Sequence, residues 1–262
     1  MLEKLLITGA SGQVARLIRD QLRHVARTIR LSDITVPTDL PEGAEFLRCD
    51  LADRDEVARI VAGCDGILHL GGISVEDSFD RILQANIIGL HNLYAAARAN
   101  GQPRILFASS NHVTGFYRRD EHIDTTAPHR PDTWYGVSKS FGEAVALMYF
   151  HKFGQETAMV RIGSCLPEPV DRRMLSTWLA PEDFVSLVAR VFEVPTLGCP
   201  VIYGVSANDA AWWDNAPADY IGWVPQRNAA EFAHRFQDEA AETGTAADRF
   251  QGGAFVDAPI HD

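Results

Sequence analysis

The stretch that decides the fold is KLLITGASGQVA, residues 4–15. Its apolar start, Lys4–Thr8, predicts a buried strand, and a helix follows the glycines. Gly9 permits a tight turn and Gly12 lets the backbone approach a pyrophosphate, while the N–H groups that begin the helix attract an anion. Ala15 stands at the third position of this spacing, where glycine is usual. Such a loop can also be a plain turn, so the rest of the chain has to decide.

Beyond this stretch, short apolar runs alternate with helical patterns, which is typical of βαβ units around a parallel sheet. We expect strands at Lys4–Thr8, Thr28–Leu31, Glu45–Cys49, Gly66–Leu70, Arg104–Ala108, Thr157–Ile162 and Pro200–Tyr203. We expect helices from the glycine turn to about Val25 and over Asp53–Ala62, Phe79–Asn100, Tyr135–Phe153 and Glu182–Phe192. The pattern predicts an α/β fold, a Rossmann-type doubly wound parallel sheet with a small C-terminal substrate-binding part.

The chain divides by composition into two parts. Residues 1–162 carry the alternating pattern and are expected to form the dinucleotide-binding core. Residues 163–262 are expected to bind substrate for the most part, with one further strand and helix returning to the core. The segments Pro167–Arg173 and Asn208–Pro225 are rich in proline and polar residues, which predicts loops over a cleft. The stretch Phe250–Val256 is apolar enough to dock on its own body or on a neighbouring subunit.

The bulk composition excludes several kinds of partner. The 262 residues are 46% hydrophobic and carry a formal net charge of −11, which argues against nucleic acid. No run of about 18 apolar residues occurs, so we expect no membrane span. The apolar start Met1–Gly9 is too short for a signal peptide, which favours the cytoplasm. Four widely separated cysteines predict reduced thiols and no metal site: Cys49, Cys64, Cys165 and Cys199.

Residues at the ends of the predicted strands favour a particular cofactor. Asp33 ends the second strand about 20 residues beyond the glycine loop, where a carboxylate accepts hydrogen bonds from the adenosine ribose. A 2′-phosphate would meet that negative charge, so NAD is favoured over NADP. Further cofactor contacts are expected along the same edge, from Gln13, Val14, Asp50, Leu51, Leu70, Gly71, Gly72 and Ser74.

Tyr135 and Lys139 lie four residues apart, on one face of a predicted helix. A phenol is a weak base near neutral pH, but a neighbouring ammonium and a positive nicotinamide ring would lower its pKa. The phenolate could then take a hydroxyl proton while hydride leaves the same carbon. Lys139 could also hold the nicotinamide ribose. This spacing occurs by chance in many helices, so it needs partners.

Two partners are available in the sequence. Ser109 and Ser110 end the fifth strand, at the same edge of the sheet, where a hydroxyl can hydrogen-bond the substrate oxygen. Asn86 lies inside a long helix, and a buried amide there needs a polar role, either catalytic or structural. Together with Tyr135 and Lys139, these residues indicate a dehydrogenase site.

The motifs taken together resemble those of the extended short-chain dehydrogenase/reductases, the NAD-dependent epimerase/dehydratase family. The resemblance covers about residues 1–205. It rests on Gly9-x-x-Gly12, Asp33, Asp50-Leu51, His69-Leu70, Asn86-Ile87-Ile88-Gly89, Ser110 and Tyr135-x-x-x-Lys139. In that pattern the serine that aligns is Ser110, not Ser109. The resemblance implies NAD as cofactor and catalytic roles for Tyr135, Lys139, Ser110 and Asn86.

A closer resemblance, over nearly the whole chain, is to the branch of this family that oxidises hexuronic acids. It is carried by HLGGISV (69–75), FASSNH (107–112), RIGSC (161–165), RMLSTW (173–178), SANDA (206–210) and RFQGGAFV (249–256). It implies oxidation of the anomeric carbon of glucuronic or galacturonic acid to an aldarolactone, with hydride going to NAD. The two epimers differ in the orientation of one hydroxyl, so both are expected substrates.

This closer resemblance also implies roles for individual residues. Tyr135 would take the C1 hydroxyl proton, and Cys165 would lie near the nicotinamide. Arg173 would pair with the substrate carboxylate, with Arg172 as the rival candidate. The other expected substrate contacts are Ser74, Ser110, Asn111, His112 and Ser164.

Two other functions remain open at this point: a nucleotide-sugar epimerase or reductase on the same scaffold, and a non-catalytic NAD-sensing regulator. The short C-terminal part favours a free sugar acid, and the intact Tyr135–Lys139 pair disfavours the regulator. We also expect a homo-oligomer, through the helices Phe79–Asn100 and Tyr135–Phe153.

Overall fold

The computed structural model describes residues 1–40, 44–237 and 244–261. Its centre is a seven-stranded sheet in the order β10-β7-β5-β4-β1-β2-β3, in which every neighbouring pair is parallel. The strands are β1 (Leu2–Thr8), β2 (Ala26–Asp33), β3 (Glu45–Arg48), β4 (Gly66–His69), β5 (Arg104–Ser110), β7 (Thr157–Ile162) and β10 (Val201–Gly204). The Rossmann-type prediction is therefore confirmed.

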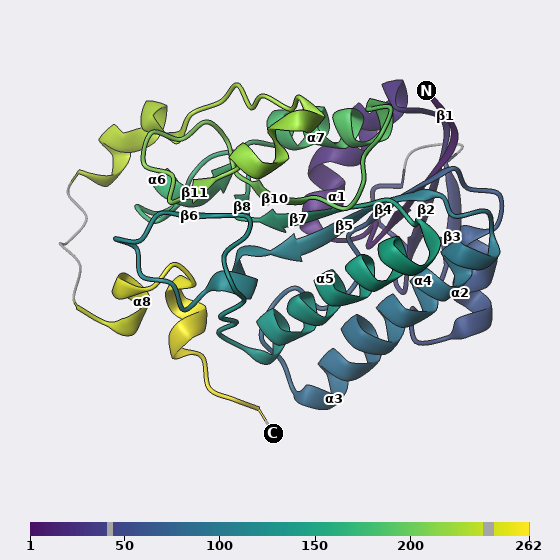
Figure 1. Ribbon diagram of the computed structural model, residues 1–262, viewed down its shortest axis with the longest axis horizontal. Coiled ribbons are helices and arrows are strands. Elements are labelled where there is room, and N and C mark those ends of the chain that lie inside the picture. Colours follow the sequence, from purple (N-terminus) through teal and green to yellow (C-terminus); the bar gives the residue numbers. More distant parts are fainter. Residues whose placement is uncertain (41–43, 238–243, 262) are drawn as a thin grey trace.

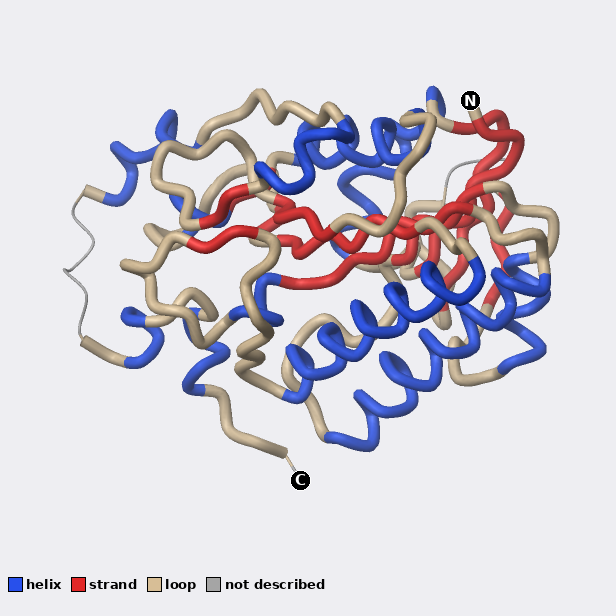
Figure 2. Tube along the Cα trace, in the orientation of Figure 1, coloured by secondary structure: helices blue, strands red, loops and turns tan. Residues whose placement is uncertain are grey.

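Helices cover both faces of this sheet. They are α1 (Gln13–Ile18), α2 (Arg54–Val61), α3 (Phe79–Ile82), α4 (Gly89–Ala99), α5 (Trp134–Phe153), α6 (Met174–Thr177), α7 (Pro181–Glu193) and α8 (Ala246–Arg249). Figure 1 shows α1 and α7 above the sheet and α2, α4 and α5 below it. Figure 2 shows the strands as a central layer between the helices. The second half of the inner strand β1 is apolar because both of its faces are covered, and Leu5, Leu6 and Ile7 are fully buried.

Local signals set where several helices begin and end. Asp53 precedes α2 and its side chain accepts from the N–H groups of Asp55 and Glu56. Thr133 does the same for α5 by accepting from Gly136 N. Gly101 follows the α4 helix in the left-handed region, with φ +84°, where glycine is favoured.

The first helix differs from the prediction. We expected one helix to about Val25, but α1 ends at Ile18 and a tighter 3-10 segment, Arg19–His24, replaces its second half. The side chain of Arg19 is buried there, so its guanidinium needs acceptors, and it donates to the carbonyls of Ala10 and Asp39. Helical periodicity does not distinguish the two kinds of winding.

The long helix expected at Phe79–Asn100 is present but is interrupted by a π-helical turn, Leu83–Ile88, between α3 and α4. Asn86 lies in this turn. Turns of this kind widen a helix by one residue and are frequent at functional sites. Here the turn places Asn86 against the loop that follows β4, through hydrogen bonds with both backbone groups of Ile73.

Residues beyond 162, together with the short segment at 123–124, form a smaller region at one end of the sheet. Two short pairs of strands lie there, β6 (Ile123–Asp124) with β11 (Trp213–Asp214) and β8 (Ser164–Cys165) with β9 (Trp178–Leu179). The strand β10 and the helix α7 return to the core. Trp213 stacks on Tyr203, with ring centroids 4.9 Å apart. None of the helices in the described ranges is long and apolar enough to cross a membrane.

The C-terminal segment docks on the body of its own chain. Phe250 pairs with Arg118 in an isolated antiparallel bridge, and Gln251 is completely buried. The Gln251 side chain donates to the carbonyls of Arg118 and Glu121 and accepts from Trp213 Nε1. Of the two docking partners that the sequence left open, the structure shows the first.

One buried ion pair ties α5 to the sheet. Glu143 on α5 and Arg161 on β7 are each 1% exposed and form two hydrogen bonds, of 2.9 and 2.8 Å. Ser109 donates to the same carboxylate at 2.6 Å. Burial disfavours the charged carboxylate, but hydrogen bonds from His129 and Arg161 outweigh it and hold the Glu143 pKa at about 2. The pair therefore stays ionised and fixes α5 against β5 and β7.

Replacing Glu143 by Gln should lower the free energy of unfolding by about 3–5 kcal/mol, because Arg161 would keep a buried charge without a counterion. The folded pKa of Glu143 lies below its ordinary value of 4.5, so its stabilisation is present above that value and is lost as pH falls toward 2. The difference between the wild type and Glu143→Gln, measured by urea unfolding, should therefore shrink in acid.

The matched control is Glu231→Gln, which removes an exposed carboxylate 3.6 Å from Arg227. Surface pairs of this kind contribute about 0–1 kcal/mol. Equal losses for the two variants would show that burial of the Glu143–Arg161 pair has no special weight.

Candidate active site

The loops that follow β1 and β4 pack closely against each other. Gly9 has a φ of +70°, and a Cβ there would lie 2.7 Å from the backbone of Leu70 and Gly71. A Cβ on Gly71 would in turn meet the Leu51 side chain at 2.9 Å. These glycines are required by close packing, and they leave bare backbone at the edge of the sheet.

Asp33 faces the glycine loop from the end of β2. Its carboxylate accepts from Ser11 N at 3.0 Å and from Thr35 N at 3.1 Å. The side chain is half-buried. Gly12, Gln13 and Val14 begin α1 beside it, and Gly12 caps the helix without a side-chain hydrogen bond. This arrangement can hold a ribose next to an anion at the helix start.

Asp50 and Leu51 follow β3 on the same edge. Asp50 uses one carboxylate oxygen locally, accepting from Ala52 N at 2.9 Å. Leu51 packs beneath Gly71 and Gly89, since a Cβ on either glycine would touch it. Its side chain is half-buried and forms part of the floor of this edge.

Asn86 links the β4 loop to α5. Its amide donates to Ile73 O at 3.0 Å and to Ser138 Oγ at 2.9 Å, and its oxygen accepts from Ile73 N at 2.8 Å. These bonds place Gly72 and Ser74 beside the first turns of α5. Asn86 thus fixes the loop after β4 against α5, and a catalytic role for it stays a prediction.

Tyr135, Lys139 and Ser110 come together at the carboxyl end of β5. The Lys139 Nζ lies 5.6 Å from the Tyr135 ring centroid and donates to Ala108 O at 2.8 Å. All three side chains are buried. Ser110 lies beside Tyr135, where it lowers the pKa of the phenol, and its Oγ accepts from His112 N. Ser109 donates to Glu143 instead, so the two neighbouring serines have different partners.

Burial dominates the protonation of this pair. It raises the pKa of the Tyr135 phenol to about 12, against the opposing hydrogen bond from Ser110. It also lowers the pKa of Lys139 to about 8. The sequence predicted that Lys139 and a positive nicotinamide ring together lower the phenol pKa; in the protein without that ring, desolvation is the larger effect and raises it. A lower pKa for the Tyr135 phenol therefore requires a positive charge bound beside it, such as that of the nicotinamide ring.

A second group of polar residues lies beside Tyr135. The His112 ring meets the Tyr135 ring at 5.7 Å and stacks on Phe255 at 3.8 Å. In the amide orientation that satisfies both of its ends, Asn111 donates to Ile162 O and accepts from Arg173 Nη2, each at 3.1 Å. Phe255 brings the C-terminal segment to this wall of the site.

Arg173 is half-buried, whereas Arg172 is exposed. The Nε and Nη2 atoms of Arg173 both donate to Gln251 O, at 3.1 and 2.5 Å. Burial lowers the pKa of Arg173 to about 10, a value at which it stays charged near neutral pH. The geometry therefore favours Arg173 over Arg172 as the cation of the site.

Ser164 and Cys165 form β8, at the far side of the same region. Ser164 shares a hydrogen bond of 3.0 Å with Thr177. Cys165 is buried, and burial raises its thiol pKa to about 12, so the thiol is neutral.

Four residues of this region were missed from the sequence: Glu76, Asp132, Gln251 and Phe255. Glu76 accepts from Tyr135 N at 2.9 Å, and Asp132 bonds His112 at 2.7 Å. Their partners lie 20 to 59 residues away in sequence, so no local pattern marks them. Phe255 and Gln251 belong to the apolar tail whose docking place the sequence left open.

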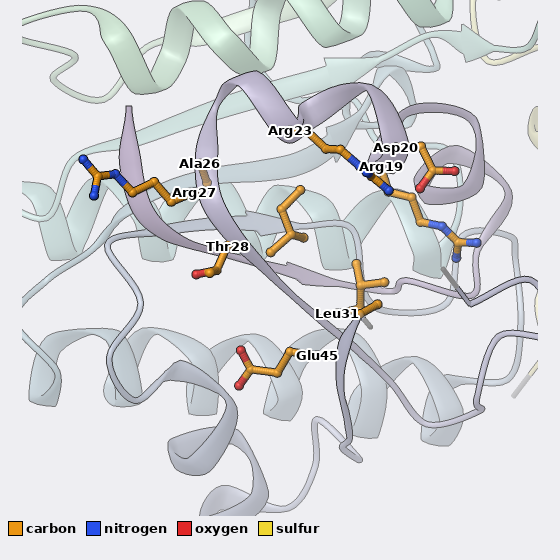
Figure 3. Close-up of a pocket in the computed structure, with 10 residues that line it drawn as sticks. Arg19, Asp20, Arg23, Ala26, Arg27, Thr28, Leu31 and Glu45 are labelled. Carbon is orange, nitrogen blue, oxygen red and sulfur yellow. The ribbon is translucent and has the colours of Figure 1, made fainter. Parts of the chain in front are cut away.

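A cavity of about 370 Å³ lies elsewhere, between the 3-10 segment Arg19–His24 and β2. Figure 3 shows the guanidinium groups of Arg19 and Arg27 directed away from each other. None of the site residues predicted from the sequence lines it. The candidate site is therefore the edge described above.

The chain is similar over its length to known enzymes of one family. Residues 5–180 match the model of the NAD dependent epimerase/dehydratase family. Uronate dehydrogenase of Agrobacterium fabrum is 55% identical over 261 residues, which is 99% of this chain and 98% of the relative. Uronate dehydrogenase of Pseudomonas putida is 45% identical, over 97% of this chain and 95% of the relative.

Solved structures give the same result. A variant of uronate dehydrogenase from Agrobacterium tumefaciens, complexed with NAD, superposes with a TM-score of 0.96 at 55% identity, over 98% of each chain. Glucuronic acid dehydrogenase from Chromohalobacter salexigens superposes with a TM-score of 0.97 at 50% identity, over 100% of this chain and 98% of the other.

Proposed function

The chain belongs to the NAD-dependent epimerase/dehydratase family, and from this membership we propose that it oxidises the anomeric carbon of hexuronic acids with NAD. The observation that carries the proposal is full-length similarity to uronate dehydrogenases, at 55% identity, in a chain that brings Tyr135, Lys139 and Ser110 together. The substrates are D-glucuronate and D-galacturonate, and the product is the aldarolactone.

The edge of the sheet suits this cofactor. The start of α1 after Gly12 would offer backbone N–H groups to a pyrophosphate, and Asp33 stands where an adenosine ribose would be held. The carboxylate of Asp33 would repel a 2′-phosphate, which supports NAD over NADP. When bound, NAD accepts the hydride from C1 and brings a positively charged ring next to the phenol.

Tyr135, Ser110 and Lys139 act on the proton and the oxygen of the C1 hydroxyl. Tyr135 takes the proton of the C1 hydroxyl, so the oxygen keeps the electron pair that becomes the carbonyl of the lactone. The Ser110 hydroxyl, beside the phenol, holds that oxygen by donating a hydrogen bond to it. Lys139 lies near the ring and supplies a cation below its pKa of about 8. A phenol with a pKa near 12 has to be activated, so proton removal depends on a loaded site.

The part of the chain from 163 to 262 supplies the substrate wall, together with the loop after β5. The carboxylate of the sugar acid pairs with Arg173, whose Nη1 end is directed away from its bonds to Gln251. Asn111, His112, Ser74 and Ser164 contact the hydroxyls. We place the boundary of the dinucleotide-binding core at residue 162, where β7 ends.

The cellular compartment and the assembly of the enzyme are inferred from its cysteines and from its exposed apolar residues. Four free thiols suit a reducing compartment, so we place the enzyme in the cytoplasm. Exposed apolar side chains on α5, namely Val137, Leu147 and Met148, suit the surface of a homo-oligomer.

The direct test of the function is an absorbance assay for NADH with galacturonate, glucuronate and a UDP-sugar as substrates. We expect NADH from both hexuronates and none from the UDP-sugar. Tyr135→Phe should abolish turnover, whereas the exposed Tyr220→Phe should keep it. Silence with hexuronates, together with conversion of the UDP-sugar, would favour an epimerase or reductase instead.

Arg173→Ala should raise the KM for hexuronate by a factor equivalent to about 2–4 kcal/mol, because a charged hydrogen-bonded pair is lost. The KM for NAD should stay the same. Arg172→Ala is the matched control and should change neither constant. If Arg172→Ala carries the loss and Arg173→Ala does not, the carboxylate is bound by the exposed arginine.

Asp33→Ala should weaken the binding of NAD and reduce the preference for NAD over NADP. The reason is that the variant lacks the carboxylate that holds the ribose and repels a 2′-phosphate. The ratio of kcat/KM for the two cofactors measures this. An unchanged ratio would remove Asp33 from the ribose site.

A further inference from the structure

Beside the catalytic tyrosine lies a hydrogen-bonded pair of His112 and Asp132. The His112 Nδ1 and Asp132 Oδ2 atoms are 2.7 Å apart. The Asp132 side chain is 0% exposed and the His112 side chain is 10% exposed. The carboxylate is thus sealed inside the protein, while the imidazole reaches the surface of the site.

The fold has a place built for this carboxylate. Thr133 Oγ1 donates to Asp132 Oδ1 at 3.0 Å. A Cβ on Gly115 would lie 1.8 Å from Asp132 Oδ2, and a Cβ on Gly252 would lie 2.1 Å from it. The loop after β5 and the C-terminal segment therefore both lack side chains where Asp132 fits between them.

The pairing decides which nitrogen of His112 carries the proton. A carboxylate offers only acceptors, so Nδ1 must donate. In the neutral ring Nε2 is then a hydrogen-bond acceptor. The stack with Phe255, at 3.8 Å and 25°, and the edge contact with Tyr135 hold the plane of the ring. Across residues 1–40, 44–237 and 244–261, no group is hydrogen-bonded to Nε2.

We propose that Asp132 is a positioning residue that makes His112 an acceptor for one ring hydroxyl of the sugar acid. This inference rests on the proposed function and deepens it. Arg173 offers only donors, which suit a carboxylate. A hydroxyl that donates needs an acceptor instead. Asp132 provides this acceptor indirectly, because its hydrogen bond to Nδ1 fixes the tautomer and the ring plane of His112 and so makes Nε2 the acceptor.

Two substitutions test the proposal. Asp132→Asn keeps the size and the acceptor for Thr133, but its amide would donate to Nδ1 and turn Nε2 into a donor. His112→Asn keeps a donor for Asp132 and removes the acceptor toward the sugar. Each should raise the KM for hexuronate about tenfold or more, which corresponds to roughly 1.4 kcal/mol. The KM for NAD should hold, and kcat should change much less.

The decisive probes are three hexuronates that each lack one ring hydroxyl, at C2, C3 or C4. For one of them, the wild type and both variants should have the same KM, because the hydroxyl that His112 accepts from is absent. The exposed Asp20→Asn is the matched control for charge and should behave as the wild type with every substrate.

Three results would overturn the proposal. A KM penalty that stays undiminished on all three deoxy compounds would place His112 on the carboxylate. An equal rise in the KM for NAD would mean that Asp132 only supports the fold. If Asp132→Asn fails to fold, His112→Asn decides alone, and an unchanged hexuronate KM in that variant would contradict the acceptor role. Loss of all NADH formation by the wild type would instead contradict the proposed function.

Discussion

The ion pair between Glu143 and Arg161 is the interaction on which the site depends. It lies inside the protein, between α5 and the sheet, and its partners are each 1% exposed. Glu143 follows Lys139 by four residues and Tyr135 by eight, so the three share one face of α5. When the pair fixes that face against β5 and β7, it also fixes the distance from the phenol to Ser110.

The same burial that secures α5 makes the catalytic phenol a poor base in the free protein. Its pKa of about 12 reflects desolvation. In the proposed mechanism the phenol therefore removes a proton only when a bound positive charge lowers its pKa. Proton removal then depends on cofactor binding. The C-terminal segment contributes to the enclosure, since Phe255 lies 6.1 Å from the Tyr135 ring.

Much of this could be predicted from the sequence because the signals are local. The buried strands are apolar runs, the glycine loop follows one of them, and Tyr135 and Lys139 have helical spacing. Other features depend on residues far apart in the chain. Asp132 meets His112 across 20 residues and Gln251 meets Arg173 across 78, so only the fold reveals them. The π-helical turn at Asn86 and the 3-10 segment after α1 follow from tertiary hydrogen bonds that helical periodicity does not encode.

The measurement that tests the central claim most directly follows the hydrogen on C1. A hexuronate carrying deuterium at C1 would be oxidised with NAD, and the reduced cofactor analysed by mass spectrometry. If hydride leaves C1 while Tyr135 takes the hydroxyl proton, the deuterium will be found in the reduced nicotinamide. Deuterium that remains in the sugar product, or that is lost to water, would contradict the account.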